Sequence, residues 1–196
     1  MSVSPFNRLL VAPIPYLPKS LVWPLSRRYI AGADLDSAYS AVNDLNAAGC
    51  SATVDVLGED SRTRDEAETA CDIYLAAIEG IERNSLNCNI SVKLSDLGLR
   101  QDAELCFAAT RALVAAANEH GNFVRIDMED SSVTDATLDI YRRLREEYSN
   151  VGTVIQSCLR RSTDDIKNLL DSVGPDVYSI VQRNISRAGN RCFQRR

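Results

Sequence analysis

Four polar side chains stand at the carboxyl ends of four short apolar runs. Asp55, Lys93, Asp127 and Gln156 follow one another at intervals of 38, 34 and 29 residues. A lysine beside two carboxylates forms either a structural ion pair or an anion-binding site in which the acids fix the ammonium. For Asp127 a solvated acidic loop is the alternative. Gln156 is either a filler or a hydrogen-bonding group for a planar ligand.

Helical and β-rich segments alternate from residue 34 onward and carry these side chains. The sequence predicts strands at 52–57, 89–94, 123–127 and 152–156, and helices at about 34–49, 63–83, 103–119, 134–148 and 163–170. Strands that alternate evenly with helices need right-handed crossovers within one parallel sheet. Two architectures meet that condition, the doubly wound sheet and the (β/α)8 barrel.

The polar strand ends distinguish these two architectures. A nucleotide-binding doubly wound sheet carries a glycine-rich turn after its first strand, and the segment Val56–Asp60 has no such pattern. Barrel enzymes instead assemble their sites from the carboxyl ends of several consecutive strands. The sequence therefore predicts an α/β chain that forms a partial (β/α)8 barrel. About the first four βα units lie within residues 34–175, and the C-terminal half of the barrel is missing.

Composition excludes several classes of partner. The net charge is −5, and no cluster of five or more basic residues is present, which argues against a nucleic-acid partner. Six cysteines without a CxxC pair, and His120 as the single histidine, argue against a metal site. Prolines interrupt the apolar stretch within residues 1–33, so we expect a strapping segment there and not a membrane span. A cytoplasmic protein is the expectation.

Five motifs resemble those of proline dehydrogenases in order and spacing. They are Tyr29–Gly32, Thr53–Glu59, Val92–Leu99, Arg125–Ser131 and Val154–Arg161. The resemblance implies a distorted (β/α)8 barrel that holds FAD, oxidises L-proline to 1-pyrroline-5-carboxylate and passes electrons to a quinone. The quinone in turn implies peripheral association with the inner face of a respiratory membrane.

The resemblance also assigns roles to the four polar side chains. Lys93 is similar to the lysine that holds the substrate carboxylate, and Asp127 to the acidic residue beside it. Asp55 resembles a further carboxylate near that lysine. Gln156 resembles a glutamine that contacts the flavin ring. A cation for a carboxylate, acids that fix the cation and an amide for a flavin edge make chemical sense together.

The resemblance ends near Pro175. A fifth-strand motif of the family fits residues from Val177 onward only when the reading frame is shifted by one base, so we predict a frameshift near residue 176 and an out-of-frame tail over 176–196. Two alternatives to a working proline dehydrogenase follow. One is an inactive truncated fragment or pseudogene product, and the other is an aldolase-like barrel in which Lys93 forms a Schiff base.

Overall fold

A single parallel sheet forms the centre of the molecule. The computed structural model describes residues 31–32, 34–58, 60–156, 159–173 and 179–182 of the chain. Its strands are hydrogen-bonded in the order in which they follow along the chain, and every pair is parallel: β1 Ala52–Asp55, β2 Cys88–Val92, β3 Val124–Ile126, β4 Val151–Gln156 and β5 Ser179–Gln182. A sheet whose order never reverses is the wall of a barrel and not a doubly wound sheet.

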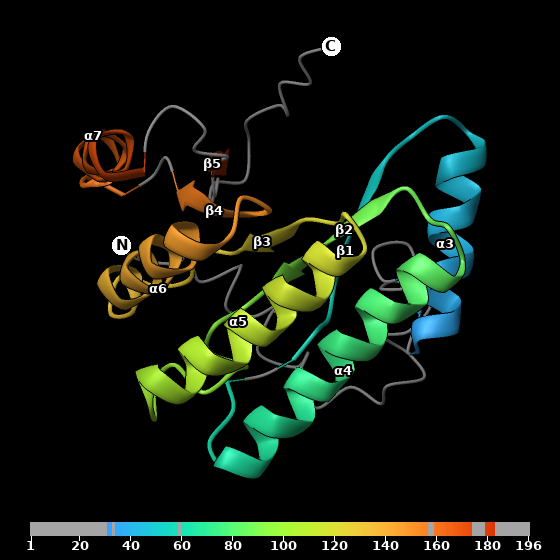
Figure 1. Cartoon of the computed structure of the whole chain (residues 1–196), viewed down its shortest axis with the longest axis horizontal. Helices are drawn as coiled ribbons and strands as arrows, with labels where there is room; N and C mark the ends of the chain where they lie inside the picture. The colour runs from blue at the N-terminus through green and yellow to red at the C-terminus, as the bar shows by residue number, and fades with distance from the viewer. Residues whose placement is uncertain (1–30, 33, 59, 157–158, 174–178, 183–196) are drawn as a thin grey trace, which may run out of the picture.

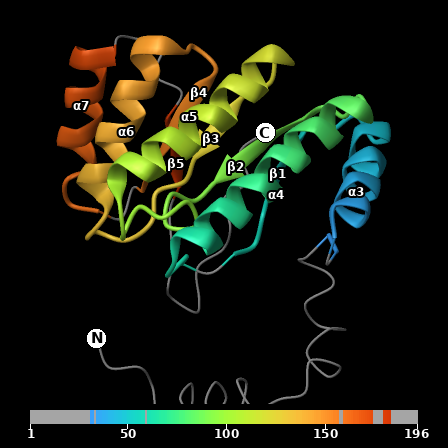
Figure 2. The same cartoon turned by 60° about the horizontal axis from the view of Figure 1, so that its bottom comes forward.

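The helices form one layer on one face of this sheet. They are α3 Leu35–Ala47, α4 Arg64–Arg83, α5 Ala103–Glu119, α6 Thr134–Glu147 and α7 Ser162–Val173. Figures 1 and 2 show them side by side in chain order, with α3 and α7 at opposite ends of the layer. Each of α4, α5 and α6 connects two neighbouring strands, so this layer is the outer wall of a half-barrel.

The helix starts are determined by local sequence. Thr63 and Glu66 make a reciprocal capping box at the start of α4, and the side chain of Asp102 accepts hydrogen bonds from the first backbone N–H groups of α5. Asp34 caps α3 in the same way, through the N–H of Ser37. Each cap satisfies N–H groups that have no partner inside the helix.

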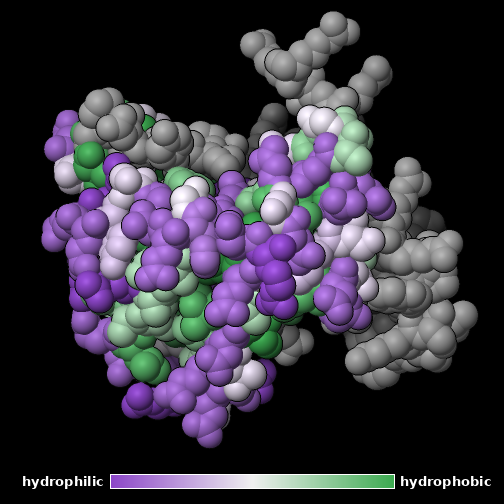
Figure 3. Space-filling model, turned by 45° about the vertical axis from the view of Figure 1, so that its right-hand side comes forward, coloured by the Kyte–Doolittle hydropathy of each residue, from purple (hydrophilic) through white to green (hydrophobic). Residues whose placement is uncertain are grey.

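The main hydrophobic core lies between the sheet and α4, α5 and α6. Its largest fully buried side chains come from both layers and include Tyr74, Ile90, Leu113, Ile126 and Leu144. Hydrophilic side chains cover much of the face in Figure 3, with apolar patches between them. The sheet and the helices therefore bury their apolar sides against each other.

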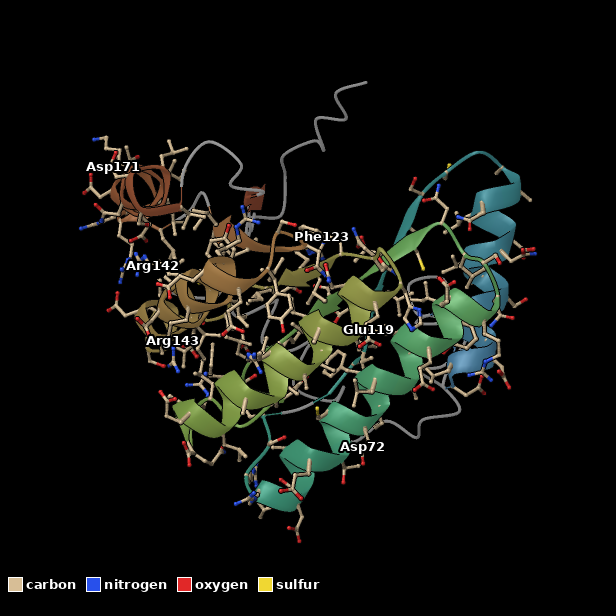
Figure 4. The ribbon with its side chains drawn as sticks, in the orientation of Figure 1. Asp72, Glu119, Phe123, Arg142, Arg143 and Asp171 are labelled. Atoms are coloured by element: carbon tan, nitrogen blue, oxygen red, sulfur yellow. The ribbon has the colours of Figure 1, made fainter. Side chains whose placement is uncertain are left out.

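Ion pairs connect α5 and α6 at the surface. Arg143, labelled in Figure 4, donates to both carboxylate oxygens of Glu104 at 2.7 and 2.8 Å. Its guanidinium carbon also lies 3.7 Å from the centre of the Phe107 ring. A bidentate pair stacked on an aromatic ring fixes the register between the two helices better than a lone surface charge would.

The parallel barrel wall predicted from the sequence is confirmed, and the four predicted strands are present. The structure adds β5, which lies inside the segment 176–196 that we expected to be out of frame. The frameshift itself stays a prediction. Apart from Ala31 and Gly32, the predicted strapping segment 1–33 lies outside the described residues. No helix within the described ranges is both long and apolar enough to cross a bilayer.

Leu113 provides a direct test of the core. It is fully buried on α5, whereas Leu170 on α7 is 47% exposed. We expect Leu113→Ala to lower the free energy of unfolding by about 2–5 kcal/mol, because the truncation leaves a cavity. Leu170→Ala is the matched control and should cost less than about 1 kcal/mol. Urea denaturation followed by circular dichroism measures both, and equal effects would contradict the core described above.

Candidate functional site

One face of the sheet is polar. Side chains alternate between the two faces of a strand, and Ile90, Val92, Val124 and Ile126 belong to the core beneath the helices. The residues between them, and those at the strand ends, lie on the opposite face. We call this set the polar face, and it consists of Asp55, Ser91, Lys93, Arg125 and Asp127.

Lys93 and Asp55 form the first ion pair on the polar face. The Lys93 Nζ atom lies 2.6 Å from Asp55 Oδ1 and 2.7 Å from Oδ2, so both carboxylate oxygens accept hydrogen bonds. The two side chains are 27% and 35% exposed. The pair remains open to solvent, and a ligand can therefore approach the ammonium.

Asp127 pairs with Arg125 and not with Lys93. Arg125 Nε donates to Asp127 Oδ1 at 3.1 Å and lies 3.2 Å from the hydroxyl of Ser91. Both Asp55 and Asp127 were predicted as partners for Lys93, and of the two Asp55 takes that place. Arg125 was missed there, although its position two residues before Asp127 puts both on the same side of one strand.

Gln156 is the last residue of β4. Its Nε2 atom donates to the backbone oxygen of Met128 at 2.9 Å, which holds the side chain against the segment that follows β3. The amide is half-buried. Three consecutive strand ends, those of β2, β3 and β4, thus place Lys93, Asp127 and Gln156 at the same edge of the sheet, as predicted.

The acidic run after β3 is not a free solvated loop. Glu129 accepts a hydrogen bond from the backbone N–H of Ser95 at 3.0 Å and another from the Ser95 hydroxyl. Asp130 accepts from Arg100 at 2.5 Å and from the N–H of Ser132 at 2.8 Å. These contacts connect the loop after β3 to the loop after β2, so Asp127 is held on an ordered segment.

A buried acid three residues after Lys93 was not predicted. Asp96 is only 3% exposed, and the Tyr74 hydroxyl lies 3.4 Å from its Oδ2 atom. Burial raises the pKa of Asp96 to about 6, Lys93 opposes the shift, and the negative charge of Glu129 adds to it. Burial also raises the pKa of Tyr74, which keeps the phenol protonated. No sequence signal separates Asp96 from a surface aspartate.

The family model described as proline dehydrogenase matches residues 38–183, which run from α3 through β5. The chain belongs to the proline dehydrogenase family. It is 38% identical to proline dehydrogenase 1 of Bacillus subtilis over 146 residues, which cover 74% of this chain and 48% of the Bacillus protein. It is 32% identical to a proline dehydrogenase of Deinococcus radiodurans over 169 residues, covering 84% and 54%.

Solved structures agree on the fold of this proline dehydrogenase chain. Proline utilization A from Bdellovibrio bacteriovorus, in a form inactivated by N-propargylglycine, matches with a TM-score of 0.75 at 24% identity, over 84% of this chain and 20% of that protein. Proline utilization A from Bradyrhizobium japonicum matches with a TM-score of 0.57, over 68% and 16%. The chain spans about half the length of the curated relatives it matches.

Asp96 gives a pH-dependent prediction. Its folded-state pKa of about 6 lies above its ordinary value of 3.8, so the folded chain retains a proton that the unfolded chain releases. The resulting stabilisation is present below pH 3.8 and is lost as the pH rises through 6. Asp96→Asn lacks this titration. We expect the variant to become more stable than the wild type as the pH rises from 4 to 7, by at most roughly 3 kcal/mol.

Thermal and urea denaturation of both chains across that pH range measure the difference. Glu119→Gln is the control, because Glu119 is an exposed residue at the end of α5, away from the strand ends. A difference between wild type and Asp96→Asn that does not change with pH would contradict the raised pKa.

Proposed function

We propose that this chain supplies the substrate-carboxylate site and one wall of the flavin site of a proline dehydrogenase that oxidises L-proline to 1-pyrroline-5-carboxylate. The observation that carries the proposal is the Lys93 ammonium at the end of β2, held by both oxygens of Asp55 and still partly exposed. Membership of the family supplies the reaction class.

The polar face suits an amino acid whose carboxylate must be held in one place. Lys93 would bind the carboxylate of proline by a charge-assisted hydrogen bond, and Asp55 would limit the positions open to the ammonium. Asp127 would hold Arg125, a second cation on the same face. The substrate would then lie along the strand ends with its ring free to face a planar cofactor.

FAD is the cofactor that the family implies, and the residues present fit it. Gln156 at the end of β4 and Arg125 on the polar face bring amide and guanidinium donors to this edge of the sheet, which is the chemistry that recognises the carbonyl and nitrogen edge of a flavin. When bound, FAD would supply the hydride acceptor. Gln156, anchored on Met128, would orient the ring. A quinone as the final acceptor, and peripheral attachment to the inner face of a respiratory membrane, belong to this proposal.

Activity requires the rest of the barrel. The edge of β1 has no strand beside it among the described residues, and a groove of about 950 Å3 follows this edge between α3 and α4. The curated relatives are about twice as long as the matched segment. A chain that stays incomplete would correspond to the inactive fragment, the first alternative, because unpaired strand edges favour aggregation over a closed site.

The Schiff-base alternative finds little support in the site. Lys93 contacts both oxygens of Asp55, an arrangement for holding a cation and not for releasing an amine nucleophile. Borohydride trapping of a carbonyl compound on Lys93 would favour that alternative.

Complementation tests the proposal. We would co-express this chain with a polypeptide that carries the remaining C-terminal part of Bacillus subtilis proline dehydrogenase 1, then measure bound flavin by absorbance and proline-dependent reduction of a dye. We expect both signals from the pair of chains together. Copurification without flavin or turnover would identify the chain as an inactive fragment.

Lys93→Met in the complemented enzyme isolates the role of the ammonium. We expect kcat/KM for proline to fall roughly 10- to 100-fold, the loss typical of one hydrogen bond to a charged group, while bound flavin is retained. Lys167→Met is the control, because Lys167 is 68% exposed on α7 and its ion pair, with Asp164 at 3.6 Å, lies within its own helix. Equal effects of both substitutions would argue against carboxylate binding by Lys93.

A further inference from the structure

Asp96 lies at a cleft that the proposed reaction does not use. The cleft has a volume of about 540 Å3 and lies between α4 and the loop from β1 to α4. Its buried residues with polar side-chain atoms are Ser61, Tyr74 and Asp96, and exposed charged residues complete its lining: Asp60, Arg62, Asp65 and Glu66. A carboxyl group that is 3% exposed at such a place requires a structural or functional reason.

Tyr74 connects Asp96 to the backbone of Lys93. Its hydroxyl lies 3.4 Å from Asp96 Oδ2 as donor, and it accepts from the backbone N–H of Lys93, also at 3.4 Å. An ionised Asp96 accepts the hydrogen bond from Tyr74 more strongly than a neutral carboxyl group does. A change in the charge of Asp96 therefore acts on the residue that carries the ammonium.

The loop after β1 is built closely around the carboxyl group. A Cβ atom added to Gly58 would lie 2.8 Å from Asp96 Oδ2, so a larger residue at this point would require the carboxyl group to shift. The hydroxyl of Ser61 donates to the backbone oxygen of Asp96 at 2.5 Å. These contacts fix the carboxyl group beside the segment that follows Asp55.

Ionisable groups from four neighbouring segments act on the charge of Asp96. Asp55 comes from β1, Lys93 from β2, Glu129 from the loop after β3 and Tyr74 from α4. Lys93 is the cation of this set. The negative charge of an ionised Asp96 therefore acts on this ammonium in addition to that of Asp55, which makes the surroundings of Lys93 less favourable for an anionic ligand.

We propose that Asp96 is a positioning residue for Lys93, and that removal of its negative charge strengthens the binding of a carboxylate at Lys93. The statement about substrate rests on the proposed function, whereas the electrostatic link between the two residues does not. Because burial raises the pKa of Asp96 to about 6, both charge states are accessible near that pH.

The chain itself allows a direct measurement of the link. It contains three lysines, Lys19, Lys93 and Lys167, so selective ¹³C labelling of the lysine ε carbons gives three NMR signals. Lys93→Arg assigns the signal of interest. Between pH 5 and 8 we expect the Lys93 signal to shift with a midpoint near 6 in the wild type, and this step to be absent in Asp96→Asn. The signal of Lys167 serves as the internal reference.

Tyr74→Phe provides a second variant that keeps the acid. The hydrogen bond from Tyr74 lowers the pKa of Asp96, so its loss should move the step in the Lys93 signal to higher pH. Circular dichroism confirms that each variant is folded. A step that persists in Asp96→Asn, or that is absent from the folded wild type, overturns the proposal.

The complemented enzyme tests the effect on substrate. At pH 7.5 we expect Asp96→Asn to lower KM for proline about fivefold, with kcat retained, and the wild type to approach the same KM as the pH falls below 6. An unchanged or higher KM in an enzyme that oxidises proline overturns the proposal. If the NMR step behaves as expected and no proline oxidation occurs, the proposed function fails and the link between Asp96 and Lys93 stands.

Discussion

Charge neutralisation at the carboxyl ends of the parallel strands is the constraint on which the site depends. A strand end brings side chains of neighbouring strands within a few ångströms, so a lone charge there would be both desolvated and close to others. Each of these cations at the strand ends is paired with an acid: Lys93 with Asp55, and Arg125 with Asp127. The two pairs are separate, and each couples a basic group to one defined acid.

The loops that follow the strands are connected to one another by further hydrogen bonds and ion pairs. The loop after β2 is the centre of this arrangement, because Ser95 binds Glu129 while Arg100 binds Asp60 and Asp130. Gly98 permits the turn, since its φ of +86° is unfavourable for other residues and a Cβ there would meet Ala67. Three loops from three βα units are thus held together by one segment, and the positions of Lys93 and Asp127 follow from it.

The sequence predicted the barrel wall and the edge on which the site lies, because both arise from periodic patterns and from the ends of apolar runs. Asp55, Lys93, Asp127 and Gln156 were predicted to lie at the strand ends in this way, and the structure places them there. Which acid pairs with which cation could not be predicted, because the spacing places Lys93 equally near Asp55 and Asp127. The tertiary structure shows that Asp127 pairs with Arg125. Asp96 was missed because its burial depends on Tyr74 and Gly58, which come from other elements.

Closure of the barrel would change the energetics of the site more than its geometry. With the polar face partly open, the pair of Lys93 and Asp55 is 27% and 35% exposed, and such a pair contributes only about 0–1 kcal/mol to stability. Further βα units would remove water from the same atoms and make every charge there interact more strongly. The half-barrel therefore already holds the charged groups in position, whereas the strength of the proposed binding of a substrate carboxylate would depend on the strands that close the wall.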